Sequence, residues 1–136
     1  MSDVYRATAG MGVPVRGSVL AAKDGFSARY DLDRKKGVFS RPAHKLAGQS
    51  YVGKVLVLDT AKGGVATAWM LHAMRTTGIV PAALILNSVN PIMVQGAALA
   101  DFTMLAGFDG DITALVPNGA QVTIEPQKRV LRILQV

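Results

Sequence analysis

The sequence predicts a single mixed α/β domain with a central parallel β–α–β unit and a closing antiparallel hairpin. Residues 55–58 and 81–86 are short continuous apolar runs, typical of strands buried on both faces, and a helical pattern lies between them. A helical crossover joins two such strands in parallel with the usual right hand. Near the C-terminus, residues 121–124 and 130–136 alternate apolar and polar side chains around a turn at Pro126, which predicts the hairpin.

Elements in the first part of the chain are shorter and more polar. Residues 1–14 are expected to be an irregular lead-in, because glycines and a proline interrupt any period. Residues 15–22 alternate between two faces and predict a strand. Residues 26–30 fit either a second strand or a loop, the charged stretch 31–37 is turn-like, and residues 40–49 have no regular period, which favours an ordered loop.

The central unit is organised around a glycine loop. Its strand at 55–58 leads to Gly63 and Gly64, which allow a sharp backbone turn or close approach to a ligand. A helix is expected next and ends before Gly78, which suits the C-terminal cap. This arrangement makes an anion-binding geometry, because free backbone N–H groups and the positive helix end point into the loop, and Lys62 adds a mobile charge. From the residues alone, a tight strand-to-helix turn explains the same pattern.

The second half of the chain continues the α/β pattern. Asn90 suits a helix N-cap, and Pro91 suits the first helical position, where its missing N–H costs nothing. Residues 92–100, rich in Ala, Leu and Met, then predict a short helix. Residues 102–105 suggest a short strand, and residues 111–115 fit either a helical turn or a strand. Two strand-and-helix units in the middle, with strands at both ends, complete the predicted domain.

Composition favours one compact domain over residues 1–136. Half of the residues are hydrophobic and 18% are charged, which fits a sizeable core and argues against disorder. The absence of cysteine excludes disulfides and thiolate metal sites, and two histidines argue against a self-contained metal site. Residues 76–100 are uncharged, but their Gly, Pro and Asn residues indicate strand, turn and helix rather than a membrane span. Because the start shows no secretory signal, a cytoplasmic protein is expected.

Charge is unevenly distributed, with a net value of +6 at pH 7. Basic residues cluster between Lys23 and Lys45, and three aspartates offset them in part. Such a balance fits nucleic acid, an acidic partner or an anionic substrate, and it also fits a surface that serves only solubility. We expect a solvated or partner-facing surface and no nucleic-acid site, because no recognised module or aromatic–basic interleaving is present.

Four stretches match, in order, motifs of one known family. Residues 26–38 are similar to its Phe-Trp-Gly-Gly-Val-Asp…Thr-Gly segment, and residues 44–50 to its His-Pro-Leu-x-Gly-x-Ser segment. Residues 53–56 match its Gly-Lys-Val-Leu strand, and residues 90–97 are similar to its Asp-Pro-Ile…Gly-Ala motif. In order and spacing, nearly the whole chain therefore resembles the small swivelling subunit of the aconitase X family. That family includes hydro-lyases such as cis-3-hydroxy-L-proline dehydratase and archaeal phosphomevalonate dehydratase.

The resemblance implies a fold, a partner and a substrate class. The fold would be a swivelling β/β/α domain that closes over the active site of a larger catalytic subunit. Its substrate would be a small carboxylate or phosphate. In the family the iron–sulfur or other metal site lies in the large subunit, so no cofactor is expected on this chain. The resemblance leaves open whether the chain also forms a homo-oligomer.

The glycine loop departs from the family. Relatives carry Gly-Arg-Gly-Ser-Ser-Ser-Gly-Ser, in which the first serine is the candidate catalytic base and the arginine contacts substrate. Here Lys62 stands at the arginine position, which keeps the charge but loses bidentate geometry. Gly64 stands at the serine position and cannot abstract a proton. Thr67 is the nearest hydroxyl and only a weak candidate base, so we assign no catalytic residue and expect Lys62, Gly63, Gly64 and Thr67 to bind substrate.

Other polar and aromatic residues have simpler interpretations. His72 falls off the apolar face of its helix and is expected to be solvated. For His44, contact with an anion or partner and a plain surface role are both open. Trp69 and the methionines are most simply core or interface packing. Asp31 and Asp33 could form a carboxylate pair for acid–base work, although capping and solvation fit so polar a turn better.

Two functions of different classes follow. The first is a hydro-lyase subunit of aconitase X type, which is not active alone. The second is a non-catalytic binding or scaffold protein that keeps the swivel fold and has lost the chemistry with the serine. A stable pair with a large subunit favours the first, and a stable homo-oligomer with no partner favours the second.

Overall fold

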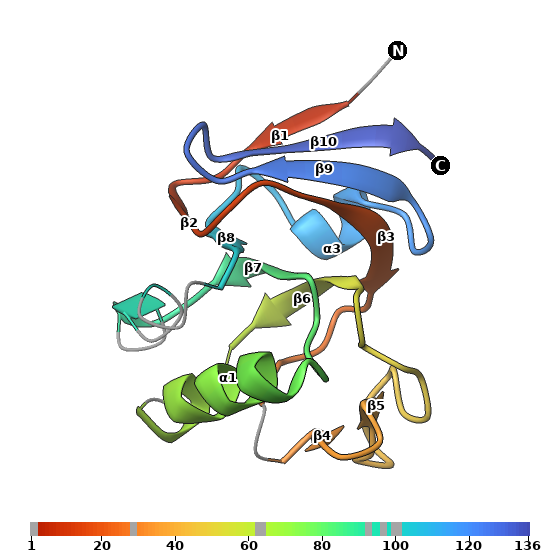
Figure 1. Ribbon diagram of the computed structural model, residues 1–136. Helices are drawn as coiled ribbons and strands as arrows, with labels where there is room; N and C mark the ends of the chain where they lie inside the picture. The colour runs from red at the N-terminus through yellow and green to blue at the C-terminus, as the bar shows by residue number, and fades with distance from the viewer. Residues whose placement is uncertain (1–2, 28–29, 62–64, 92–93, 96–97, 99–101) are drawn as a thin grey trace.

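A computed structural model describes residues 3–27, 30–61, 65–91, 94, 95, 98 and 102–136. In Figure 1, β1, β10 and β9 lie at the top, β6 and β7 lie in the middle, and α1 lies below them with β4 and β5. The elements in chain order are β1 (Val4–Arg6), β2 (Ala9–Met11), β3 (Val15–Ala21), β4 (Leu32–Asp33), β5 (Val38–Phe39), β6 (Val55–Thr60), α1 (Val65–Thr77), β7 (Ala83–Ser88), β8 (Met104–Ala106), α3 (Ile112–Leu115), β9 (Gln121–Glu125) and β10 (Val130–Gln135).

One curled sheet dominates the described part of the chain, with the order β1-β10-β9-β3-β6-β7-β8-β2. Strands β3, β6, β7 and β8 run parallel, and the other neighbours are antiparallel. The edge strands β1 and β2 are consecutive in the chain. Between them, the Ala7 N–H donates to the Arg129 carbonyl (2.8 Å), while the Thr8 N–H donates to the Gly107 carbonyl (2.8 Å). One stretch of chain therefore joins both edges, and the sheet wraps around its own core.

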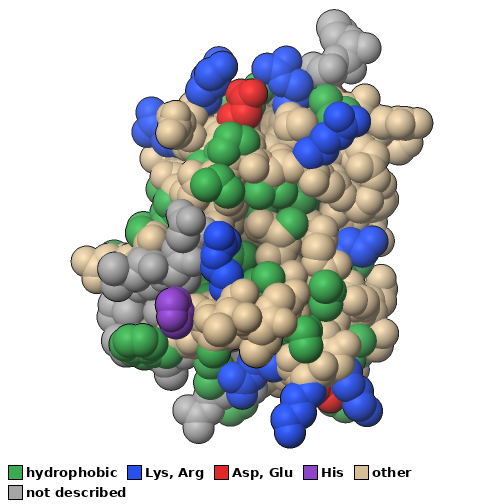
Figure 2. Space-filling view, in the orientation of Figure 1, with side chains coloured by type: hydrophobic (Ala, Val, Ile, Leu, Met, Phe, Trp, Pro, Cys, Tyr) green, Lys and Arg blue, Asp and Glu red, His purple; other side chains and the backbone are tan. Residues whose placement is uncertain are grey.

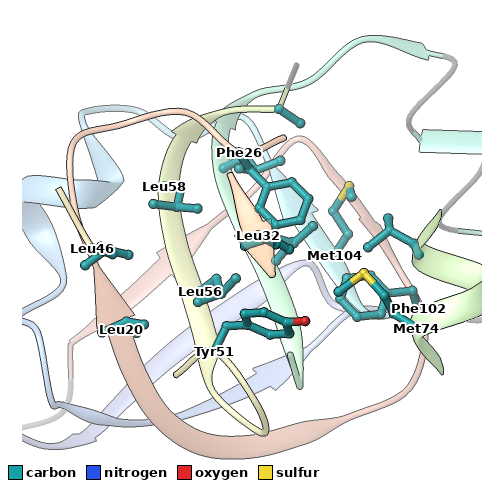
Figure 3. Close-up of a cluster of buried hydrophobic side chains, with 14 of the residues drawn as sticks. Leu20, Phe26, Leu32, Leu46, Tyr51, Leu56, Leu58, Met74, Phe102 and Met104 are labelled. Carbon is teal, nitrogen blue, oxygen red and sulfur yellow. The ribbon is translucent and has the colours of Figure 1, made fainter. Parts of the chain in front are cut away.

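Strand alternation divides the apolar side chains into two cores. Val55 and Val57 of β6 point into an inner core, which the curled sheet and α3 enclose. Leu56 and Leu58 point the other way, into an outer core beneath α1. Because burying such a side chain fully is worth about 1.5–3 kcal/mol, β6 is fixed from both faces. Figure 3 shows this outer core, which includes Phe26, Leu32, Tyr51, Met74, Phe102 and Met104.

The described side chains of helix α1, residues 69–77, pack on the outer core with one face. Leu71 and Met74 are buried, whereas Trp69 and His72 are exposed. The exposure of His72 confirms the prediction that it is solvated. The exposure of Trp69 excludes a role in the core of this chain. The helix ends at Thr77 and is followed by Gly78, which has a φ of +80° and whose N–H donates to the Met74 carbonyl (3.0 Å). The predicted C-terminal cap is therefore confirmed.

The β6–α1–β7 unit, the strand at 15–22 and the closing hairpin are confirmed, but the irregular lead-in at 1–14 is wrong. That segment contains β1 and β2, which are three-residue strands at the edges of the sheet. Gly10, which reads as a breaker, lies inside β2 and pairs with Leu105. A Cβ at this position would lie 2.6 Å from the Pro126 carbonyl oxygen. Close approach of the β9–β10 turn, and not a loop, therefore requires this glycine.

Two open alternatives are now resolved. The described part of residues 26–30 is a loop, with one isolated bridge between Phe26 and Ala61. Residues 111–115 form the helical turn α3, and Asp111 caps it by accepting a hydrogen bond from the Thr113 N–H (3.0 Å).

A further helical segment begins at Pro91, as predicted, and the Val94 N–H donates to the Asn90 carbonyl (3.2 Å). Residues 92, 93, 96, 97, 99 and 100 of that predicted helix lie outside the described residues. Within the described ranges, every helix is too short or too polar to cross a membrane.

Candidate functional site

Two hydroxyls lie side by side where β6 and β7 end. Thr60 is the last residue of β6 and pairs in register with Ser88, the last residue of β7. The Ser88 hydroxyl donates to the Thr60 hydroxyl at 3.2 Å, in an exposed position. By strand alternation both side chains lie on the same side of the sheet as Leu56 and Leu58, which is the side that α1 covers. These two residues are called the hydroxyl pair below.

The predicted anion loop connects this strand end to α1. Ala61 follows β6 and α1 begins at Val65, so the connection leads from the carboxyl edge of the sheet into a helix N-terminus, as predicted. Lys62, Gly63 and Gly64 lie outside the described residues, and their expected contact with an anion stays a prediction. Thr67 is the third residue of α1, and its side chain is outside what the structure describes.

On the other side of the same strand ends, an amide joins two carboxylates. The Asn87 Nδ2 group donates to Asp59 (2.9 Å) and to Asp111 (2.8 Å). The Asn87 Oδ1 atom accepts from the backbone N–H of Ile112 (2.7 Å), at the start of α3. Asn87 therefore satisfies three partners and fastens α3 to the ends of β6 and β7. These side chains are called the inner network below.

Lys23 offsets part of the negative charge in the inner network. The Lys23 ammonium lies 3.1 Å from Asp111. Hydrogen bonds from the Thr113 hydroxyl and then from Asn87 lower the pKa of Asp111 well below its ordinary value of 3.8. The hydrogen bond to Asp111 in turn raises the pKa of Lys23. A strongly ionised Asp111 cannot act as a general acid near neutral pH, so the geometry indicates a structural ion pair.

His44 is buried and holds the segment that pairs with the end of β6, so the surface role left open for it is wrong. Its ring is buried and stacks on Phe39 with a centroid distance of 4.6 Å. The Nδ1 atom accepts from the Leu46 N–H (3.0 Å), which leaves Nε2 to donate to the Gly25 carbonyl (2.8 Å). The segment held in this way pairs with β6, since the Phe26 N–H donates to the Thr60 carbonyl (2.8 Å). His44 thus positions the strand end that leads into the anion loop.

Asp31 and Asp33 do not form a carboxylate pair. Asp31 is buried, accepts from the Ser27 N–H (2.9 Å) and is paired with the Arg41 guanidinium, so the expected solvation is wrong for this residue. Asp33 accepts from the N–H groups of Lys35 and Lys36 at 3.1 Å each, which lowers its pKa and confirms the expected capping role. Both carboxylates therefore organise the loop and leave no acid–base dyad.

An open groove of about 540 Å³ lies beside the hydroxyl pair. Ser88 and Asn87 line it at the end of β7, and Pro91 and Val94 line it from the following helical segment. Thr8 and Gly107 are among the residues that line its opposite side. Its position outside the carboxyl ends of parallel strands is where open α/β sheets bind ligands.

Sequence reasoning missed the hydroxyl pair, although a signal for it exists. Thr60 and Ser88 each come two residues after an apolar run, Leu58 and Leu86 being the last residues of those runs. Equal offsets after two parallel strands place the side chains on one side of the sheet. The inner network had no such signal, because Asp59, Asn87 and Asp111 come together only in the folded chain.

Comparison with known proteins identifies the family. The family model for the aconitase X swivel domain matches residues 4–133. The chain is similar to the phosphomevalonate dehydratase small subunit of Methanopyrus kandleri, with 29% identity over 117 residues that cover 86% of this chain and 87% of that protein. Its counterpart from Pyrococcus horikoshii is also 29% identical, over 122 residues that cover 90% and 89%.

Solved structures agree on the fold. The holo-form crystal structure of Thermococcus kodakaraensis aconitase X superposes with a TM-score of 0.88 and 22% identity, covering 98% of this chain and 99% of that chain. The solution structure of a UPF0107 protein gives a TM-score of 0.83, also at 22% identity, with coverage of 99% and 100%. These matches confirm the predicted swivel fold, and with the family model spanning residues 4–133, the chain belongs to the aconitase X swivel domain family.

Proposed function

We propose that this chain is the small subunit of an aconitase X-type dehydratase, in which it closes over the active site of a large catalytic subunit. The observation that carries the proposal is family membership across residues 4–133. Relatives named phosphomevalonate dehydratase small subunit match it over 86% and 90% of its length. In this proposal the chain supplies only part of an active site, so we expect no dehydratase activity from this chain alone.

The carboxyl edge of β6 and β7 is the proposed substrate-facing surface. In this proposal the amides of Gly63 and Gly64 and the charge of Lys62 face the carboxylate or phosphate of a small substrate. The hydroxyls of Thr60 and Ser88 supply further hydrogen-bond donors at the same edge. Support comes from the connection itself, since a strand that leads through glycines into a helix presents free N–H groups to an anion.

The chain's proposed share of the chemistry is charge stabilisation. Dehydration removes a proton and a hydroxyl group from neighbouring carbons, and preorganised donors stabilise the negative charge that develops. Gly64 has no side chain to accept that proton, so the base comes from another residue or from the large subunit. The iron–sulfur or other metal site is likewise assigned to the large subunit. This chain has no cysteine, and its described residues contain no group of three or more metal-ligating side chains.

Co-expression with the putative large subunit tests the proposal. The pair is purified by size-exclusion chromatography and assayed for dehydration of cis-3-hydroxy-L-proline and phosphomevalonate. We expect a stable pair whose kcat/KM falls at least about tenfold on Lys62→Ala, because one charge-assisted contact to an anion is worth about 1.5–3 kcal/mol. Lys54→Ala, which removes a lysine from the opposite end of β6, is the matched control and should leave kcat/KM within about twofold.

Each outcome separates the alternatives. A stable pair with no turnover on either compound would mean a different substrate or a regulatory role. Failure to pair would contradict the subunit assignment. It would leave the non-catalytic binding or scaffold protein that the loss of the serine at position 64 suggests.

A further inference from the structure

The outward face of α1 carries an unusual stripe. Trp69, His72, Ala73 and Thr76 are all exposed and lie at i, i+3, i+4 and i+7, so they form one row along the helix. Trp69 is 69% exposed and is the only tryptophan in the chain. Its ring meets the His72 ring edge-to-face at a centroid distance of 6.3 Å. These four residues are called the Trp69 stripe below.

The composition of α1 is that of a helix covered on both faces. Among its thirteen residues, Val65–Thr77, Arg75 is the single charged side chain. A helix with one solvent face normally carries charged residues there, and a helix that is apolar all round is normally buried. Yet among the described side chains of the helix, residues 69–77, this chain buries only Leu71 and Met74, with Met70 partly buried. The Trp69 stripe therefore has the composition of a covered surface.

Charge around the stripe indicates what covers it. A surface hollow is lined by Asp33, Arg34 and Lys35 and by Ala73 and Thr77 of α1, so two basic side chains and one acidic side chain lie beside the stripe. Arg34, Lys35 and Lys36 are all exposed. Figure 2 shows Lys and Arg side chains at both ends of the molecule, and those at the lower end lie around the region of β4 and β5. Two copies facing each other through this rim would repel, so charge complementarity favours a different, acidic partner.

We propose that the Trp69 stripe is a docking surface for the large catalytic subunit, with Trp69 seated in an apolar pocket that has an acidic rim. This inference rests on the proposed function. Tryptophan is enriched among the residues that dominate interface energetics. The stripe starts one turn into α1, so docking here would fix the helix that follows the anion loop.

Titration of the purified full-length chain against the large subunit tests the inference. Trp69→Ala should weaken affinity about 30-fold or more, and Trp69→Phe should restore most of it. Leu134→Ala is the matched control, because Leu134 is an exposed apolar side chain of β10, at the other end of the molecule in Figure 1. The Trp69 fluorescence, taken as the difference between complexes of the wild type and of Trp69→Phe, should shift to the blue on binding. Arg34→Glu with Lys35→Glu should slow association about tenfold at low salt and reduce its salt dependence.

The results distinguish this inference from the proposal beneath it. If the wild type binds the large subunit and Trp69→Ala binds equally well, the docking surface lies elsewhere and the subunit assignment stands. If the wild type does not bind, the docking inference and the subunit assignment are both wrong. If Trp69→Ala converts a self-associated chain to a monomer in analytical ultracentrifugation, the occupant is a second copy and the proposed partner is wrong. A melting temperature shared by the wild type and Trp69→Ala shows that loss of binding is not loss of fold.

Discussion

The two sides of one strand end differ in how far the chain satisfies its own polar groups. On the inner side, Asn87 hydrogen-bonds two carboxylates and a backbone N–H, and Lys23 neutralises one of those carboxylates. On the outer side, one residue further along β7, Ser88 is exposed and donates to Thr60 at 3.2 Å. A step of one residue along a strand therefore moves from a network that stabilises the fold to donors that face outward.

This difference indicates which polar groups at the carboxyl edge of the sheet stabilise the fold and which are candidates for binding a ligand. A polar group with several partners in its own chain stabilises the fold, and removing it leaves those partners unsatisfied. A polar group that lines a groove at a strand end and has few partners in its own chain remains available for a ligand. The inner network and His44 are of the first kind, and Ser88, which lines the groove and whose described hydrogen bond is to Thr60, is of the second. Mutations that compare the two kinds make this distinction measurable.

His44→Ala should give the largest effect. It removes a buried ring stacked on Phe39 and leaves the Gly25 carbonyl and the Leu46 N–H without their partner. We expect a loss of about 3 kcal/mol in the free energy of unfolding, measured by urea denaturation. His72→Ala is the matched control and should change the free energy by less than about 0.5 kcal/mol, since His72 is exposed. Equal effects at both histidines would contradict the positioning role.

Asn87→Ala should have the next largest effect. The substitution deletes three hydrogen bonds and leaves Asp59 and Asp111 facing each other without the amide between them. We expect a loss of about 2 kcal/mol in the same assay, less than for a fully buried group because Asn87 is only partly buried. Asn87→Asp adds a third carboxylate and should be worse. A neutral result for Asn87→Ala would show that the inner network is not structural.

The sequence predicted the elements whose signal lies within one short stretch of residues. Apolar runs located β6 and β7, and Gly78 marked the end of α1. Strand β2 was missed because the strand that it pairs with is distant in the sequence: Ala9 pairs with Ala106, 97 residues further along the chain. A three-residue edge strand has too few residues to show a period, so only its partner identifies it.

The candidate site was predicted in outline and missed in detail for the same reason. The glycine loop has its strand, turn and helix in one continuous stretch, so its place at the carboxyl edge followed from the sequence. His44 and its partner Gly25 are 19 residues apart, and Asn87 and Asp59 are 28 apart. A loop histidine with no regular period around it looks exposed until the fold closes over it. Family motifs could mark residues 44–50 as a segment but not as a buried one.

Acid should weaken the inner network in a defined direction. The folded-state pKa of Asp111 is lowered from 3.8, so its carboxylate stabilises the fold above that value, and the contribution is lost as the pH falls through it and below. We expect the free energy of unfolding to fall from about pH 5 downward. Asp111→Asn should be less stable at pH 7 and should flatten that fall. An unchanged slope in Asp111→Asn would mean that other carboxylates carry the acid sensitivity.

Ser88→Ala should have the smallest effect on the fold. Ser88 lies beside Asn87 in β7, but its hydroxyl is exposed and its described hydrogen bond is to Thr60, so the free energy of unfolding should change by less than about 0.5 kcal/mol. If the hydroxyl pair faces the substrate as proposed, kcat/KM of the complex with the large subunit should still fall about fivefold, because one lost hydrogen bond is worth about 1 kcal/mol. Ser88→Thr keeps the hydroxyl and should retain most of the activity. Full activity in Ser88→Ala would confine substrate contact to the loop at 62–64. A large loss of stability would instead place Ser88 with Asn87 among the groups that hold the fold together, and the contrast between the two sides of the strand end would not hold.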